Sequence, residues 1–123
     1  MPITRVVFFR EDDGKVPFLD WFGGLSIHAK DQCAAKLTLL RDQGHELRRP
    51  AAENLGGGIY EPRAKSRGVN YGMLYFFAGQ RAIVLSHGFD KQQAKVPKRD
   101  TQQAKERMGQ FEADPRAHTH KES

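Results

Sequence analysis

The spacing of apolar residues in the first third of the chain predicts one strand followed by two helices. Residues 3–9, ITRVVFF, are β-branched and aromatic and end at the acidic turn EDDG, which is typical of a strand. A short aromatic run, residues 17–22, starts at a proline and stops at two glycines, so it predicts a brief helix. Ser26 and Gly44 can cap the two ends of a longer helix. Its apolar stripe at helical spacing consists of Ala29, Cys33, Ala34, Leu37 and Leu40.

The remainder of the chain predicts three strands and a final helix. Residues 46–58 contain Pro50 and three glycines, and this composition predicts a loop. Strand-like runs follow at 59–64, 71–78 and 82–89, and a tight hairpin joins the last two. A helix over residues 98–111 would bury Ala104, Met108 and Phe111.

This order predicts an α+β fold in one domain, residues 1–113. An N-terminal strand, a helical pair and a three-stranded antiparallel meander would form a mixed or antiparallel sheet, closed by the C-terminal helix. At 123 residues the chain matches the usual length of a single domain. Residues 114–123 are polar and contain Pro115, so we expect a flexible tail there.

Composition narrows the class of protein. No apolar run approaches the roughly 20 residues that a membrane helix needs, and no cleavable signal is visible at the N-terminus. The single cysteine, Cys33, excludes an internal disulfide and a cysteine-rich zinc site, and its place on the helical stripe predicts a core position. We therefore expect a cytoplasmic protein without membrane partners.

Positive charge is concentrated in one block of the sequence. The net charge is +5, but residues 1–59 carry eight Lys or Arg and eight Asp or Glu. Residues 60–99 carry eight Lys or Arg against two acidic residues, a balance of +6, and residues 100–123 come to −1. A basic block of this kind favours a polyanion such as nucleic acid, although a solvated surface would give the same pattern.

The common catalytic signatures are absent from the sequence. There is no phosphate-binding glycine loop, no HExxH and no GxSxG, so we expect no metal and no cofactor. His118 and His120 could contact a metal, but two histidines in a polar terminus are more often incidental. Trp21 and Phe22 are expected to anchor the short helix to the sheet.

The strand that begins at residue 59 separates its side chains by alternation. Tyr60 and Pro62 would lie on one face, and Glu61 and Arg63 on the other. Because Pro62 lacks a backbone donor, we expect this strand at a sheet edge or bulged there.

In the last strand, alternation predicts that Val84 and Ser86 face away from Ile83, Leu85 and His87. Arg63, His87, Lys91 and Lys95 would then converge at one end of the sheet. Fixed cations without metal ligands suit RNA cleavage by the 2′-hydroxyl, because Arg and Lys can stabilise the phosphorane charge and His or Lys can move protons. The same cations could instead only hold phosphates in place.

The segment NLGGGIYEPRAKSRGVNYGMLYFFAGQRAIVLSHGFDKQQAKVPKRDTQQAKERM resembles the phage-derived HigB-like toxins of the RelE superfamily. Their pattern is Leu-Gly-x-Gly-hydrophobic-Tyr-Glu-Leu-Arg, then Tyr-Arg-x-x-Tyr-Phe, then His-Gly-Phe-x-Lys-Lys and a Thr-Pro before a helix. The resemblance extends weakly through the N-terminal strand and the helical pair, including VPFLDWF, and so reaches up to about residue 112.

The resemblance implies the toxin of a type II toxin–antitoxin system, with a RelE-like fold and a helix-turn-helix antitoxin as partner. Its activity would be metal-independent, ribosome-dependent cleavage of mRNA in the A site, which inhibits translation. Arg63, His87 and Lys91 match the family pattern and are the implied catalytic residues. The other cations of the basic block are then expected to bind RNA: Lys65, Arg67, Arg81, Lys95, Lys98 and Arg99.

Three departures from the pattern fall near this site. The arginine after Tyr71 is Gly72, the second lysine is Gln92, and the leucine before Arg63 is Pro62. Loss of one charge-stabilising donor costs on the order of 10²–10³ in rate. The chain is therefore either an active RNase, a catalytically weakened relative that still binds RNA, the ribosome or an antitoxin, or a module that only pairs with an antitoxin-like protein.

Overall fold

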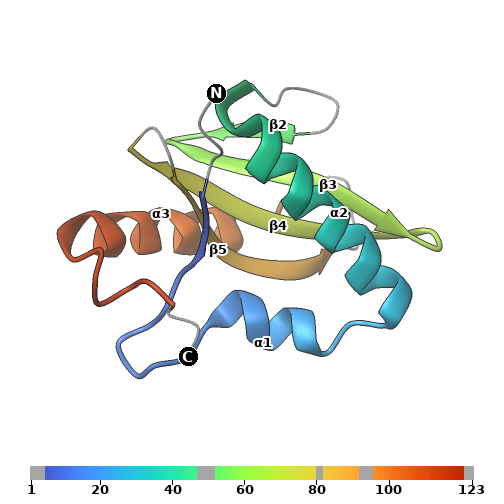
Figure 1. Cartoon of the computed structure of the whole chain (residues 1–123), viewed down its shortest axis with the longest axis horizontal. Helices are drawn as coiled ribbons and strands as arrows, with labels where there is room; N and C mark the ends of the chain where they lie inside the picture. The colour runs from blue at the N-terminus through green and yellow to red at the C-terminus, as the bar shows by residue number, and fades with distance from the viewer. Residues whose placement is uncertain (1–4, 47–51, 80–81, 92–95, 121–123) are drawn as a thin grey trace.

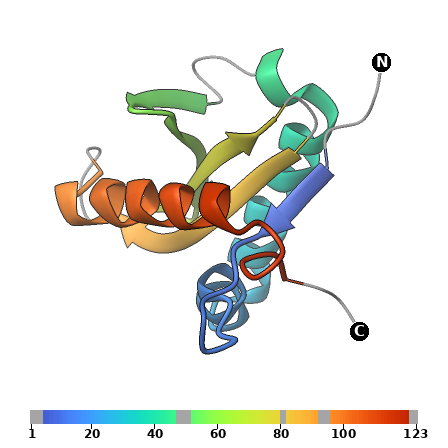
Figure 2. The same ribbon diagram turned by 90° about the vertical axis from the view of Figure 1, so that its left-hand side faces the viewer.

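The computed structural model describes residues 5–46, 52–79, 82–91 and 96–120, which form a five-stranded sheet with helices on both faces (Figure 1). The strands are β1 (Arg5–Phe8), β2 (Ala52–Gly56), β3 (Ile59–Ser66), β4 (Val69–Ala78) and β5 (Ala82–Lys91). The helices are α1 (Pro17–Gly23), α2 (Ile27–Gln43), the short 3₁₀ helix η1 (Gly44–Glu46) and α3 (Lys98–Ala113). The helices α1 and α2 cover one face, and α3 covers the other (Figure 2).

The sheet is mixed, in the order β1-β5-β4-β3-β2. Its strands β2 to β5 are antiparallel neighbours, whereas β1 pairs with β5 in parallel. This confirms the predicted α+β fold, with its meander and its N-terminal strand. The prediction of a loop over residues 46–58 was wrong in part, because β2 forms within it and pairs with β3.

Pro62 does not mark a sheet edge. In the register Ala52 pairs with Pro62, so β2 covers β3 and is itself the edge strand. The five residues of β2 are the hydrogen-bonding neighbour of β3. The glycine- and proline-rich composition of residues 46–58 did not predict this strand. The register of β3 with both of its neighbours also passes Pro62 without a shift, so the expectation of an edge position or a bulge at Pro62 is wrong.

Local signals fix the ends of α2. The Ser26 hydroxyl accepts a hydrogen bond from the Ala29 backbone nitrogen at 3.1 Å, as the cap prediction requires. Gly44 follows the last turn with φ +47, a left-handed conformation that glycine adopts at low cost. Along the predicted stripe, Ala29, Cys33 and Leu40 are buried, whereas Ala34 is exposed.

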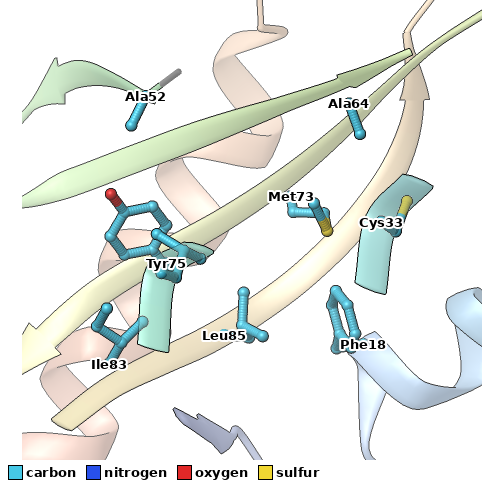
Figure 3. Packing of buried hydrophobic residues seen from close by; sticks show 9 residues of the cluster. Phe18, Cys33, Ala52, Ala64, Met73, Tyr75, Ile83 and Leu85 are labelled. Carbon is cyan, nitrogen blue, oxygen red and sulfur yellow. The ribbon is translucent and has the colours of Figure 1, made fainter. Parts of the chain in front are cut away.

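The core between the sheet and the helical pair is large and aromatic. Phe18 of α1 and Cys33 of α2 belong to one cluster of buried residues with Met73 and Leu85 of the sheet (Figure 3). Cys33 is fully buried, and desolvation, with a smaller effect of the Asp90 charge, raises the pKa of its thiol to about 11. This burial confirms the prediction that Cys33 is a core residue. A protonated, enclosed thiol is also a poor nucleophile.

The opposite face holds a second core and the end of the chain. Leu74, Val84 and Phe111 pack there, and residues 114–120 then return along β1. The His118 imidazole donates from Nδ1 to the Arg10 carbonyl at 2.8 Å and stacks on Phe9. The segment that we expected to be flexible therefore lies against β1 as far as residue 120. Within the described ranges, no helix is both long enough and apolar enough to cross a membrane.

Candidate functional site

Three neighbouring strands bring the candidate residues of the basic block into adjacent rows. Arg63 on β3 pairs with Gly72 on β4, which pairs with Phe89 on β5. A second row lies two positions closer to the β3–β4 hairpin. In it, Asn70 of β4 pairs with Lys65 on one side and with Lys91 on the other. Since strand side chains repeat every two residues, these rows belong to the same face of the sheet, the face that α3 covers farther along. For Arg63 and Lys91 the structure describes this backbone register.

Gly72 permits a close contact that any other residue would prevent. A Cβ atom at this position would lie 2.5 Å from Cζ of Phe89 and 2.9 Å from Oε2 of Glu61. Glu61 is fully buried, so its carboxylate and the Phe89 ring together fill the space above the strand. Gly72 therefore lets the aromatic ring lie directly on β4, where the resemblance implies an arginine side chain.

His87 is on the opposite face from the one that alternation predicted. A shift in register between Leu74 and Tyr75 pairs Tyr75 with Leu85 but Leu74 with His87, so β5 has one extra residue there. This bulge carries both Ser86 and His87 to the α3 side of the sheet. The predicted separation of Ser86 from His87 is wrong for this reason.

The His87 ring is enclosed between two hydrogen-bonding partners. Its Nε2 donates to Asp100 Oδ1 at 3.0 Å, because a carboxylate can only accept, and its Nδ1 accepts from the Ser86 hydroxyl at 2.8 Å. His87 is 7% exposed, and this burial lowers its pKa below 6.5, with a further lowering from Arg107 and an opposing effect of Asp100. A neutral, covered imidazole of this kind links β5 to α3 through Asp100 and leaves little of its ring open to solvent.

Arg107 extends this buried polar cluster and was missed in the sequence. Its guanidinium donates to Glu11 Oε1 at 2.6 Å and to Ser86 Oγ at 3.4 Å, and it lies over the Phe9 ring. Arg107 sits on the apolar stripe of α3, between Ala104 and Phe111. An arginine on a buried stripe was the sequence signal for a partner such as Glu11.

Ser86, His87 and Asp100 carry the side chains of a hydrolase triad, but their placement is unsuited to that chemistry. Ser86 is fully buried, so its hydroxyl is closed to a substrate. Its neighbour Arg107 also donates to the same oxygen, which lowers the ability of that oxygen to attack. The cluster therefore connects β5, α3 and the turn after β1 as a structural element.

Four of the cations predicted to bind RNA are exposed, two at the β3–β4 hairpin and two at the start of α3. Lys65 and Arg67 are exposed on the β3–β4 hairpin, and Lys98 and Arg99 are exposed in the first turn of α3. Arg67 has φ +50 and is followed by Gly68 at φ +83, so the two form a turn with both residues left-handed. Arg81 and Lys95, also predicted to bind RNA, lie outside the described residues, as does Gln92.

Trp21 fixes the end of β5 from the other face of the sheet. Its indole lies so close to Gly88 that a Cβ atom there would overlap the ring, and Nε1 donates to Asp90 Oδ1 at 3.2 Å. The predicted anchoring of α1 by Trp21 is confirmed. No group of three His, Cys, Asp or Glu side chains in the described part of the chain is arranged to hold a metal ion.

Comparison with protein-family models matches residues 20–109 to the family described as Phage derived protein Gp49-like (DUF891). The chain belongs to this Gp49-like family. The match runs from α1 into α3. It includes every predicted catalytic residue and the exposed cations of the β3–β4 hairpin and of the first turn of α3. It confirms the phage-derived part of the resemblance, and the family is associated with toxin-like proteins. No curated protein matches the sequence.

Proposed function

We propose that this Gp49-like protein is the toxin of a type II toxin–antitoxin system and acts on mRNA at the ribosome. The observation that carries this proposal is the row arrangement of Arg63, Lys65 and Lys91 beside the exposed Arg67. Four cations on one end of a sheet can follow a phosphate backbone. The family match supports the proposal independently of charge.

Cleavage of mRNA is the reaction that this arrangement favours. The 2′-hydroxyl of one nucleotide would attack the adjacent phosphorus, the P–O5′ bond would break, and a 2′,3′-cyclic phosphate and a 5′-hydroxyl would result. Arg63 and Lys91 would stabilise the charge on the phosphorane, and Lys65 and Arg67 would hold flanking phosphates. Because His87 is bonded to Asp100 beneath α3, its proposed part is to position β5, not to transfer a proton.

A second candidate function is binding of RNA or the ribosome without efficient cleavage. The contact of Phe89 and Glu61 at Gly72 favours it, because the space for a third stabilising cation is filled. In either case we propose a small helix-turn-helix antitoxin as the protein partner, and expect its gene beside that of the toxin.

Cleavage of a defined mRNA on programmed ribosomes, with 5′ ends mapped by primer extension, separates these functions. The unchanged protein would be compared with Arg63→Ala and with Arg41→Ala, which removes an exposed arginine of α2 paired with Asp42. An active toxin should lose about 10²-fold or more in rate with Arg63→Ala and keep its rate with Arg41→Ala.

If the unchanged protein does not cleave mRNA, a variant that restores the arginine at position 72 is tested next. Gly72→Arg alone would collide with Phe89, so Phe89→Ala is combined with it to provide room. Cleavage by the double variant would identify a weakened relative. If neither protein cleaves mRNA and neither sediments with ribosomes, both RNA functions are excluded, and pairing with an antitoxin-like protein remains.

A further inference from the structure

A cavity of about 600 Å³, largely open to solvent, lies at the end of the sheet opposite the β3–β4 hairpin. Its floor is one row of the register, in which Ala82 of β5 pairs with Ala78 of β4 on one side and with Arg5 of β1 on the other. Alanine side chains end at Cβ, so this row leaves open the volume that Phe76 and Val84 fill in the next row. The hollow follows directly from two small residues in register.

The C-terminal segment forms the other wall of the cavity. Phe111 from the end of α3 lines one side, and Pro115, Arg116 and Thr119 line the next. This wall is held in place, because Thr119 forms a bridge with Phe9 and its hydroxyl donates to the Pro115 carbonyl at 2.6 Å. Residues that the sequence predicts to be a tail therefore form one wall of this cavity.

The charges at the rim select the kind of ligand. Arg5 and Arg116 come from opposite ends of the chain and both line the cavity, whereas Glu112 is the one carboxylate among its described lining residues. The Ala78 and Ala82 side chains and the Phe111 wall are apolar, and the volume falls within the roughly 300–1,000 Å³ of small-molecule sites. A guanidinium binds a carboxylate through two parallel hydrogen bonds.

We propose that this cavity binds a small amphipathic carboxylate, with its aliphatic or aromatic body on Ala78, Ala82 and Phe111 and its carboxylate at Arg5 and Arg116. The site is separate from the basic rows at Arg63 and Lys91, because Ala78 and Val69 lie at opposite ends of β4. It requires no RNA and no partner protein.

Decanoate is a suitable probe, with decanol as the same chain without charge and acetate as the charge without the chain. Titrations below micelle-forming concentrations would be followed by calorimetry and by amide NMR shifts. Decanoate should bind saturably at one site, with a Kd in about the millimolar range or tighter, and should shift the amides of Ala78, Ala82 and Phe111. Acetate and decanol should bind at least about fivefold more weakly.

Two variants and one control assign the contacts. Arg116→Glu should weaken decanoate binding about fivefold to tenfold, and Ala78→Leu should abolish it by filling the hollow. Arg99→Glu makes the same charge change in the first turn of α3, away from the cavity, and should leave the Kd unchanged. A dispersed amide spectrum establishes that each variant is folded. Equal binding of decanol, shifts spread over the whole protein, or an unchanged Kd in Arg116→Glu would overturn the proposal.

Discussion

The ring of Phe89 occupies the space into which a side chain at Gly72 would project. A Cβ atom at Gly72 would approach Cζ of Phe89 to 2.5 Å, well inside van der Waals contact. The two residues pair directly across β4 and β5, so the contact is part of the sheet itself. Glycine in the middle of a strand usually weakens it, and here the packed ring compensates for that loss.

Gly72→Ala should therefore destabilise the protein by about 1–3 kcal/mol, because the methyl group forces Phe89 and Glu61 apart. Gly109→Ala is the matched control: it lies in α3 with open space around it, and should stabilise the protein by about 0.5–1 kcal/mol. Urea unfolding measures both. Equal effects of the two substitutions would show that the ring does not constrain position 72. Adding Phe89→Leu to Gly72→Ala should restore part of the loss.

Burial of His87 predicts a dependence of stability on pH. Its pKa in the folded protein lies below the value of 6.5 in the unfolded chain, because burial disfavours the imidazolium. Above 6.5 both states are neutral and the contribution of His87 to stability is complete. As the pH falls below 6.5 the unfolded chain takes up the proton first, so that contribution is lost toward the folded pKa.

Replacement of His87 by Gln tests whether its contribution to stability falls as the pH is lowered. The loss of unfolding free energy caused by His87→Gln should be largest at about pH 7.5 and should shrink toward about pH 5. Urea unfolding of both proteins across this range gives the difference directly. A difference that grows on acidification would mean that His87 is charged in the folded protein.

Arg107→Met should cost about 1–3 kcal/mol, because Glu11 and Ser86 each lose a charged donor while the apolar contact with Phe9 is kept. A double-mutant cycle with Glu11→Gln isolates the ion pair. The coupling should be favourable, and its size is moderated because the Glu11 side chain is 37% exposed. Additive effects of the two substitutions would contradict an energetic link between α3 and the turn after β1.

Arg67→Asn should have opposite effects on stability and on RNA binding. Asparagine adopts left-handed conformations more readily than arginine, so the turn with Gly68 should gain up to about 1 kcal/mol. Loss of the charge should reduce the salt dependence of RNA or ribosome binding by about one phosphate contact. Lys65→Gln, which removes a neighbouring charge outside the turn, should weaken binding without the gain in stability. Unchanged binding in both variants would exclude the hairpin as an RNA contact.

Local sequence signals predicted most of the fold. The Ser26 cap, the glycine after α2 and the two-residue periodicity of β3 and β4 each act within a few residues, and each appears in the structure. The strand β2 was missed because its pairing with β3 is a tertiary effect that outweighs the glycine-rich composition of residues 46–58.

The candidate site was predictable in its charges but not in its geometry. Alternation placed Glu61 and Arg63 together, and the register agrees. The bulge that moves His87 to the side of Ser86 left no signal in the sequence, since it depends on how β5 meets β4 and α3. Burial of His87 and the partnership of Arg107 with Glu11 depend on contacts between residues far apart in the chain, which periodicity does not encode.

Trp21 is the one tryptophan of the sequence, and it lies on the reverse side of the strands that carry the candidate site. Indole emission responds to hydrogen bonding and to the polarity around the ring. The indole donates to Asp90, the residue before Lys91, and Tyr71 lies 6.2 Å from it, close enough to transfer excitation energy. The protein thus contains its own fluorophore, placed to report without a label when the end of β5 moves.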